Sequence, residues 1–519
     1  MPVLGPVRTI TTPVFGDTKI LSVHSRPYSG NGEPGSKFHR RRIHQKQMIS
    51  ADNRSHRGRR QLVLSVLGSC LAIWAAACSR INQDLRVATG LVSHTVCSET
   101  FVSGLDPNQV YAESIKPRPG MSLINWAVRD DVDRARKEVT TTVAGAFESH
   151  AVYRNELGCL VVHGEEPADA TLPKIVAAED RPLVLLLPDI AGPATVKPAN
   201  EGLRAALDRA FAEPDRPPYR WVKAIVVMHD GSVVAERYAP GYGIGTPLLG
   251  YSATKSVINA LLGILVRQQR LSVEQPAPVA AWSDPSDPRH AITIDELERM
   301  TSGLALDETD SLASPVSRML YVERDMAGFA ERAPLEATPS STWNYTSGNT
   351  LILSRIIRDM VGGHSSDVLN FARSELFDPL GMRNVTLEFD ATGTPIGSTY
   401  MLASARDWAR FGMLYLDDGV VGGRRILPEG WVRYSSSRTL DSMYAAGFWL
   451  GASQWRARWG IPDDTFFASG LLGQRVVVIP SRRLVIVRFG VTEDFPNFDI
   501  QGLGRLIADV IAAVSEKPR

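Results

Sequence analysis

Two predicted β-hairpins, far apart in the sequence, constrain the fold of this chain more than any other feature. The first joins the apolar run Trp221 to Met228 to the alternating run Val233 to Tyr238 through Asp230-Gly231, a pair typical of tight hairpin turns. The second joins Arg475 to Ile479 to Arg483 to Phe489 near the end of the chain. Strands at both ends of one region predict a sheet that is assembled from distant segments.

The residues between and after the hairpins are predicted to be helical. Lys255 to Gln268 carries apolar residues at helical spacing, and the same spacing recurs in Ile294 to Met300, Leu351 to Val361, Ser366 to Leu376, Ser404 to Leu416 and Gly502 to Val514. No internal repeat is visible. We therefore expect an α+β domain over residues 203–519, with an antiparallel sheet flanked by helices and a mainly helical subdomain.

Charge is distributed unevenly along the chain. The 519 residues are 44% hydrophobic and carry a formal net charge of +1, but residues 1–60 hold 12 lysines and arginines against three acidic residues. The remainder is therefore acidic, which argues against a nucleic-acid partner because phosphate binding needs a basic surface. We interpret residues 1–60 as a disordered basic tail, with a nucleic-acid-binding arm as the alternative and Met48 as a second possible start.

A membrane-targeting segment follows the tail at residues 61–78. Residues 62–78 are uncharged, long enough for the lower limit of a bilayer span, and preceded by several arginines. The positive-inside rule then predicts a membrane-tethered protein whose body lies on the periplasmic or extracellular face. A cleaved signal, an uncleaved anchor and a lipid on Cys70 or Cys78 remain open, and a buried core helix is the alternative.

Residues 81–202 are predicted to form an N-terminal extension of unknown role. It contains a polar run at Arg129 to Lys137 and strand-like stretches at Leu160 to His163 and Leu183 to Leu187. Cys97 and Cys159 are the two cysteines beyond the apolar segment, so an oxidising compartment makes them candidates for a disulfide. Two buried thiols are the alternative.

Ser252 and Lys255 form the first candidate catalytic pair. They belong to the only S-x-x-K of the chain, and Lys255 is the single lysine between Lys223 and Lys517. This spacing at a helix start places both side chains on one face, where a desolvated lysine can accept the proton of a serine nucleophile. Arginine stays protonated and cannot replace it. The alternative is an ordinary helix start with Ser252 as N-cap.

Two further elements are candidates for the same site. Tyr345 and Ser347 lie just before a predicted helix, where the tyrosine can carry a proton if cations lower its pKa, or can simply pack its ring. Ser469, Gly470 and Leu471 precede a predicted strand. Small residues there allow close backbone approach and an N–H donor to an oxyanion, although a tight turn or edge bulge would use the same residues.

The order and spacing of these elements resembles the serine β-lactamase and penicillin-binding-protein family, and within it the class C-like branch with esterases and 6-aminohexanoate-dimer hydrolases. Ile292 to Leu304 and Tyr400 to Trp431 are similar to flanking segments of the family. The resemblance covers about residues 203–515 and implies a β-lactamase/DD-peptidase-like fold. It is specific for the superfamily and says little about the substrate.

The resemblance also implies roles for individual residues. Ser252 would be the acylated nucleophile, Lys255 its base or base partner and Tyr345 the proton shuttle, while Ser347 stands where many members have asparagine. The backbone N–H groups of Ser252 and Leu471 would form the oxyanion hole. One departure argues against a β-lactamase and against a D-Ala-D-Ala peptidase, because Ala468 stands where a lysine or histidine usually gathers a substrate carboxylate, and we leave open whether Arg475 replaces it.

Other chemistries lack their motifs. His229, His290 and His364 are isolated from one another, so the sequence predicts no metal site and no cofactor, and no G-x-S-x-G occurs. We expect a serine hydrolase that cleaves a small amide or ester through an acyl-enzyme. The alternatives are a β-lactamase or D-Ala-D-Ala carboxypeptidase, and a catalytically silent module that binds cell-wall peptide or a partner protein.

Overall fold

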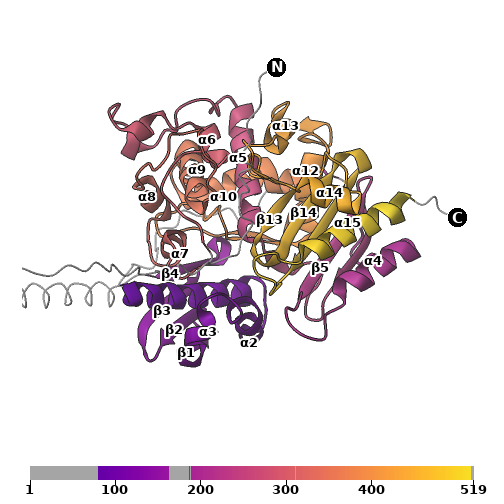
Figure 1. Ribbon diagram of the computed structural model, residues 1–519, viewed down its shortest axis with the longest axis horizontal. Helices are drawn as coiled ribbons and strands as arrows, with labels where there is room; N and C mark the ends of the chain where they lie inside the picture. The colour runs from indigo at the N-terminus through magenta and orange to yellow at the C-terminus, as the bar shows by residue number, and fades with distance from the viewer. Residues whose placement is uncertain (1–79, 163–185, 188, 310, 516–519) are drawn as a thin grey trace, which may run out of the picture. The chain divides into compact units, whose positions relative to one another are not determined.

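The computed structural model describes residues 80–162, 186–187, 189–309 and 311–515 (Figure 1). Residues 79–519 form one compact unit. The predicted basic tail, the apolar segment 62–78 and both candidate lipidation sites, Cys70 and Cys78, lie outside the described residues. Within those residues, every helix is too short or too polar to span a membrane.

The two predicted hairpins meet in one six-stranded antiparallel sheet, as expected. Its order is β12-β13-β14-β15-β5-β6. The strands are β12 (Trp449–Leu450), β13 (Phe466–Gly470), β14 (Gln474–Ile479), β15 (Leu484–Gly490), β5 (Val222–His229) and β6 (Ser232–Tyr238). Val487 of β15 pairs with Val226 of β5, which joins the hairpins. Asp230 and Gly231 both have positive φ, the conformation that a two-residue hairpin turn requires.

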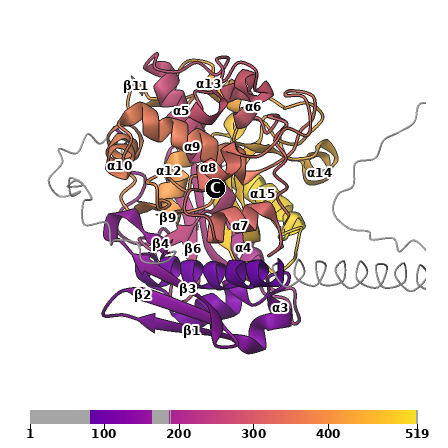
Figure 2. The same cartoon turned by 90° about the vertical axis from the view of Figure 1, so that its left-hand side faces the viewer.

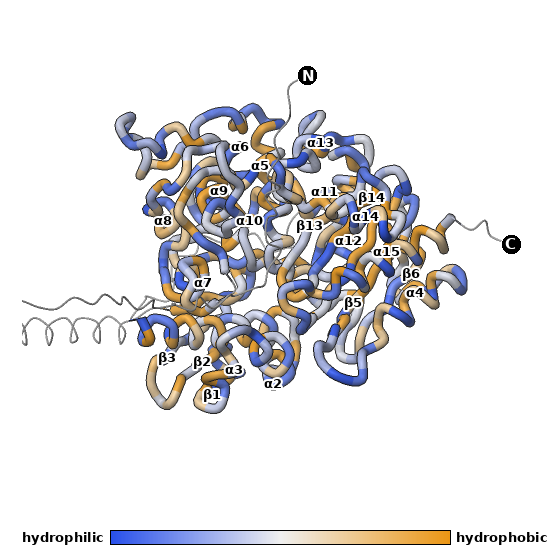
Figure 3. Tube along the Cα trace, viewed as in Figure 1, coloured by the Kyte–Doolittle hydropathy of each residue, from blue (hydrophilic) through white to orange (hydrophobic). Residues whose placement is uncertain are grey.

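Both faces of this sheet are buried under helices. Helices α4 (Glu201–Phe211), α14 (Ser453–Trp459) and α15 (Ile500–Ser515) cover one face, where Ile225 and Ile486 lie in a core with Leu207 and Ile507. Helix α12 (Ala405–Leu416) packs against the other face. The residues of β5 and β14 are therefore almost all buried, and most of them are apolar (Figure 3).

A helical region separates β6 from β13 along the chain. Its helices are α5 (Thr254–Arg267), α6 (Ile294–Glu298), α7 (Pro315–Tyr321), α8 (Met326–Glu331), α9 (Ser347–Val361), α10 (Ser365–Ala372), α11 (Asp378–Leu380) and α13 (Trp431–Ser436). Two small sheets accompany them: β7 (Pro247–Leu249), β9 (Met401–Ser404) and β8 (Val385–Leu387) form one, and β10 (Val420–Val421) with β11 (Arg424–Arg425) forms the other. The predicted helices are found within a few residues of their expected ends.

The N-terminal extension has its own antiparallel sheet. A helix over residues 80–97 leads through α2 (Pro107–Val110) and α3 (Met121–Ile124) into the order β1-β2-β3-β4, shown in indigo in Figure 2. The strands are β1 (Val128–Asp133), β2 (Glu138–Val143), β3 (Ala146–Tyr153) and β4 (Cys159–Val162). The polar run at 129–137 thus forms β1 and a turn, because an exposed strand tolerates Asp and Arg.

Two further predictions in the extension have different outcomes. A disulfide joins Cys97 at the end of the helix to Cys159 in β4, as predicted. The predicted strand at 183–187 is described only at Leu186 and Leu187, and there it is wrong: both residues lie outside any strand, and their backbone N–H groups donate to the carbonyl of Pro379 in α11. Apolar composition alone misled this prediction, since the residues simply pack against the body.

A buried carboxylate connects the extension to the helical region. Glu388, which follows β8, accepts hydrogen bonds from Ser98 Oγ at 2.9 Å and from the backbone N–H of Cys159 at 2.8 Å. His94 Nε2 lies 3.0 Å from the same carboxylate. Glu388 is fully buried, so each of its partners compensates part of the cost of removing a charge from water. The extension is thereby fixed to the body.

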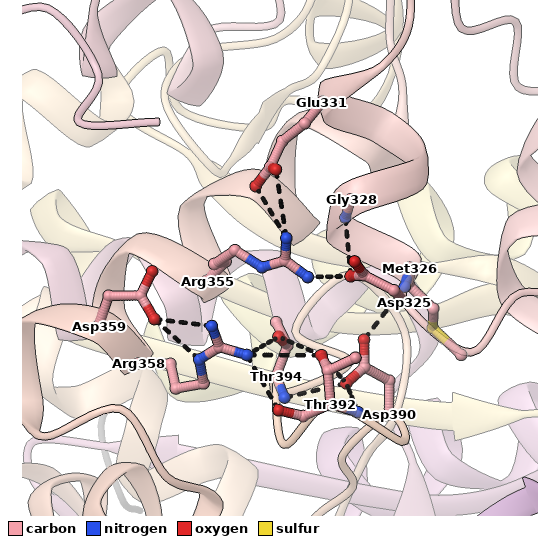
Figure 4. A network of polar contacts seen from close by, with 10 residues as sticks. All are labelled: Asp325, Met326, Gly328, Glu331, Arg355, Arg358, Asp359, Asp390, Thr392 and Thr394. Atoms are coloured by element: carbon pink, nitrogen blue, oxygen red, sulfur yellow. Dashed lines mark hydrogen bonds and ion pairs between the residues drawn. The ribbon is translucent and has the colours of Figure 1, made fainter. Parts of the chain in front are cut away.

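A polar network fixes α9, the helix that begins at Ser347, against its neighbours (Figure 4). Arg355 Nη1 lies 3.2 Å from Glu331 Oε2, and the same guanidinium binds Asp325 at the start of α8. Arg358, one turn further on, donates to Thr394 Oγ1 at 2.9 Å. The network therefore holds α9 to α8 and to the loop after β8, which leads on to residue 398.

Candidate active site

Ser252 and Lys255 are in contact, as their spacing predicts. Ser252 lies in a short 3₁₀ turn (Tyr251–Ala253), and Lys255 is the second residue of α5. Lys255 Nζ is 3.0 Å from Ser252 Oγ. The alternative in which Ser252 caps the helix is wrong, because Ala253 occupies the N-cap and no side chain caps this end.

Lys255 is buried among three oxygen atoms. Besides Ser252 Oγ, its Nζ lies 3.0 Å from Ser347 Oγ and 3.0 Å from the carbonyl oxygen of Ser398. Burial lowers the pKa of Lys255 to about 8, although the charge of Glu308 opposes this shift. A neutral Lys255 could still donate to Ser347 and Ser398, leaving its lone pair for the proton of Ser252.

Tyr345 lies beside the same pair. Lys255 Nζ lies 4.9 Å from the centre of the tyrosine ring, and Ser252 is a neighbour that acts on the pKa of the phenol. Burial, reinforced by the charge of Glu308, raises the pKa of Tyr345 well above its ordinary value. The sequence allowed the tyrosine to carry a proton if cations lower its pKa, and that condition is not met: Lys255 faces the ring, and the phenol keeps its proton.

The ring of Tyr345 belongs to an aromatic cluster. Its centroid lies 5.2 Å from that of Trp449 in β12 and 5.5 Å from that of Tyr444. Trp343 completes the cluster at 6.3 Å from Tyr345. Such packing confirms the ring contacts that the sequence left as an alternative, and it holds the phenol in one position beside Ser252.

Glu308 and Ser398 are residues of the site that the sequence did not identify. Ser347 donates its hydroxyl to Glu308 Oε1 at 3.0 Å, and its backbone N–H donates to the same carboxylate. Glu308 therefore binds a direct neighbour of Lys255 and acts on the pKa of both Lys255 and Tyr345. Both missed residues lie in loops without a motif, and Ser398 contributes only its main chain, so no sequence signal marked them.

The end of β13 lies against the turn that carries Ser252. A Cβ atom on Gly470 would clash with the carbonyl oxygen of Gly250, so only glycine allows this approach. Ser469 and Leu471 flank this contact without a hydrogen bond to the Ser252 or Lys255 side chain among the described residues. A tight turn follows this contact, with Leu472 at φ 58°, so the alternative of a tight turn is found; backbone approach to a ligand stays a prediction.

Arg475 does not supply, at the surface, the cation that the resemblance leads us to expect at Ala468. Ala468 is fully buried in the sheet opposite Val476. Arg475 is also buried, and its Nη1 donates to the carbonyl oxygens of Gly470 at 2.9 Å and Gln474 at 2.7 Å. Burial and the neighbouring guanidinium of Arg488 lower the pKa of Arg475 to about 9. Arg475 thus supports the strand end from within the sheet.

The described residues contain no group of three or more His, Cys, Asp or Glu side chains placed to bind a metal ion. The site described above consists of a hydroxyl in contact with a buried amine, a protonated phenol beside them, and a closely packed strand end. This set can transfer a proton from a serine and donate one to a leaving group.

Comparison with known proteins agrees with this geometry. The profile of the Beta-lactamase family matches residues 223–510. A 6-aminohexanoate-dimer hydrolase of Paenarthrobacter ureafaciens is 25% identical over 318 residues, covering 56% of this chain and 77% of the relative. Among solved structures, a putative 6-aminohexanoate-dimer hydrolase from Bacillus anthracis aligns with a TM-score of 0.50 and 21% identity, covering 63% of this chain and 89% of that protein.

Proposed function

The chain belongs to the Beta-lactamase family, and from this premise we propose that it is a serine hydrolase that cleaves a small amide or ester through an acyl-enzyme. The observation that carries the proposal is the 3.0 Å contact between Ser252 Oγ and the buried Nζ of Lys255. A serine becomes an effective nucleophile when an adjacent base accepts its proton, and a lysine whose pKa is lowered to about 8 is such a base.

The proposed reaction proceeds in two steps. Ser252 Oγ attacks the substrate carbonyl carbon while its proton moves to Lys255, and the backbone N–H groups of Ser252 and Leu471 stabilise the oxyanion. Tyr345 donates its proton to the departing amine or alkoxide and recovers one from Lys255. Water then attacks the ester carbon, gives one proton back through the same residues, and releases Ser252 with a carboxylic acid product.

Neutral substrates suit this site better than carboxylate-bearing ones. Ala468 offers no cation where the resemblance leads us to expect one, and Arg475 is engaged by the carbonyls of Gly470 and Gln474. We therefore favour short amides or esters over β-lactams and D-Ala-D-Ala peptides. The relative named above, a 6-aminohexanoate-dimer hydrolase, supports an amide as the bond that is cleaved; it does not bear on the preference for neutral substrates, because a linear dimer of that amino acid ends in a carboxylate.

A catalytically silent binding module is the second candidate. The buried lysine argues against it, because a desolvated amine costs free energy that a binding module has no reason to retain. Contacts of Lys255 with three oxygens keep that amine in one place, as proton transfer requires.

The proposal includes a location. Residues 62–78, or a lipid on Cys70 or Cys78, would hold the body at the periplasmic or extracellular face of a membrane. The disulfide between Cys97 and Cys159 supports this, because such bonds persist in oxidising compartments. Membrane fractionation and reporters fused after residue 162 test it, and full-length protein that stays in the cytoplasm would contradict it.

Labelling tests the function directly. A fluorophosphonate should modify Ser252 alone, identified by peptide mass spectrometry, and Ser252→Ala should abolish the signal. The same protein is then offered p-nitrophenyl esters, linear amide dimers, a chromogenic cephalosporin and D-Ala-D-Ala peptides. Turnover of the first two classes in preference to the others supports the proposal; an unlabelled wild type without turnover would reject it.

A further inference from the structure

The N-terminal extension touches the turn that carries the nucleophile. Arg118 Nη2 donates a hydrogen bond of 2.9 Å to the phenol oxygen of Tyr251, the residue immediately before Ser252. Arg118 Nε donates to the carbonyl of Ser114 at 2.9 Å, which fixes the guanidinium within the extension. Arg118 and Tyr251 are 6% and 4% exposed, so water does not compete for this bond.

Tyr251 has a backbone conformation that needs support. Its φ is +47°, in the left-handed region that disfavours residues with a side chain. Such conformations persist where the surroundings hold them, and they concentrate at functional sites. The hydrogen bond from Arg118 holds the far end of the tyrosine, and the strained backbone at its near end sets the direction of Ser252.

The extension supports the lysine's position as well. The ring of His94 lies 4.1 Å from the ring of Tyr400, measured between centroids. Tyr400 is two residues after Ser398, whose carbonyl accepts a hydrogen bond from Lys255. Residues 80–162 lie wholly outside the part of the chain that the family profile matches. Ser252 and Lys255 are thus both supported by a segment that lies outside the match to the family profile.

We propose that Arg118 is a positioning residue for the nucleophile: it orients Ser252 through Tyr251, so that the extension is an integral part of the active site. This inference rests on the proposed function of Ser252. It predicts that loss of the Arg118–Tyr251 hydrogen bond slows acylation of Ser252 without changing the groups that perform the chemistry.

The surroundings of Arg118 decide which variants are informative. The extension and the body meet there around Glu99, Glu113 and Lys223, and Lys223 forms an ion pair with Glu113. The charge of Arg118 lowers the pKa of Glu99, which burial raises to about 7. Replacing Arg118 therefore also disturbs a buried carboxylate, whereas Tyr251→Phe removes one oxygen atom and leaves every charge in place.

The experiment uses the full chain and compares three variants with the wild type. Tyr251→Phe and Arg118→Met each remove the hydrogen bond from one end, and the double variant removes both partners. Arg154→Met is the matched control, because Arg154 also joins the extension to the body, but by a bond from its Nη2 to the carbonyl of Phe389. We measure the second-order rate of fluorophosphonate labelling, kcat and KM for a p-nitrophenyl ester, and Tm.

Tyr251→Phe should slow labelling and lower kcat by about tenfold to a hundredfold with KM nearly unchanged, since a misdirected nucleophile loses rate and not binding. Arg118→Met should lower the labelling rate and kcat at least as far. The double variant should be little slower than the slower single variant, because the hydrogen bond between Arg118 and Tyr251 is lost in all three. The pH at which activity reaches half its maximum should stay constant in Tyr251→Phe, since Lys255 keeps its contacts. Arg154→Met should lower Tm without slowing labelling.

Two results would overturn the inference. One is Tyr251→Phe with wild-type labelling and kcat; the other is equal slowing in Tyr251→Phe and Arg154→Met, which would indicate general loosening of the extension. Failure of the proposed function is a different result, because the wild type itself would then remain unlabelled. A labelled wild type with an insensitive Tyr251→Phe variant rejects only the role of Arg118.

Discussion

The helical side of the site and its sheet side contribute different kinds of groups. The helical side contributes side chains that contact one another, namely Ser252, Lys255, Tyr345 and Ser347. The sheet side contributes the main chain of Gly470, which packs on the carbonyl of Gly250, and the ring of Trp449 beside Tyr345. Under the proposed function, proton transfer belongs to the helical side, while the sheet side sets shape and offers backbone donors.

The largest effect is expected from a substitution on the helical side. Lys255→Arg keeps a positive charge but removes any group that can accept a proton, so kcat/KM should fall by about 10² to 10⁴, the range typical of losing a general base. Fluorophosphonate labelling should fall in parallel. Lys197→Arg, an exposed lysine outside the site, is the control. Turnover in Lys255→Arg at the wild-type rate would show that charge alone suffices.

The pH profile sharpens the same assignment. Because the pKa of Lys255 is lowered to about 8, most of the lysine is protonated at pH 6 and neutral at pH 9. A general base works when neutral, so kcat/KM should rise about a hundredfold over that range and level off above pH 8. Glu308→Gln should move the rise to lower pH, since the Glu308 charge raises this pKa. A flat profile would contradict the assignment.

Gly470→Ala tests the sheet side. The φ of Gly470 is −123°, which alanine adopts freely, so the main obstacle is the clash of the new Cβ with the carbonyl of Gly250. The carbonyl belongs to the main chain and cannot move aside cheaply, so the turn of Ser252 should shift. We expect a loss of about tenfold to a hundredfold in kcat/KM. Gly192→Ala is the control, since its Cβ meets no atom within 4 Å.

Arg475→Met should have the smallest effect. Arg475 binds main-chain carbonyls inside the sheet, and an apolar residue of similar size often replaces a buried charge at little cost. Hydrolysis of neutral esters should stay within about fivefold of the wild type, equivalent to about 1 kcal/mol. A loss confined to carboxylate-bearing substrates would instead identify Arg475 as their binding cation.

The sequence predicted the parts of the fold and site that local pattern controls. Both hairpins and the main helices follow from alternation, turn residues and helical spacing. The contact of Ser252 with Lys255 follows from their separation on one helical turn. The disulfide between Cys97 and Cys159 followed from counting cysteines in a presumed oxidising compartment.

The rest depends on contacts between distant segments. Nothing near Glu308 in the sequence indicates that it binds Ser347, and nothing near Arg118 indicates that it reaches Tyr251. The sequence also could not give the direction of the Tyr345 pKa shift, which burial and the carboxylate of Glu308 determine. Such environments exist only after the loops and the extension have packed, so a local pattern cannot encode them.

The pairing of β5 with β15 determines when the central sheet can first form during synthesis. β5 ends at His229 and its partner β15 begins at Leu484, so the whole helical region is made between them. Until β15 is made, one edge of β5 pairs with β6 and the other edge has no neighbour, which invites aggregation and chaperone binding. Such long-range pairing also folds slowly. A chain truncated before β15 should therefore be inert and short-lived.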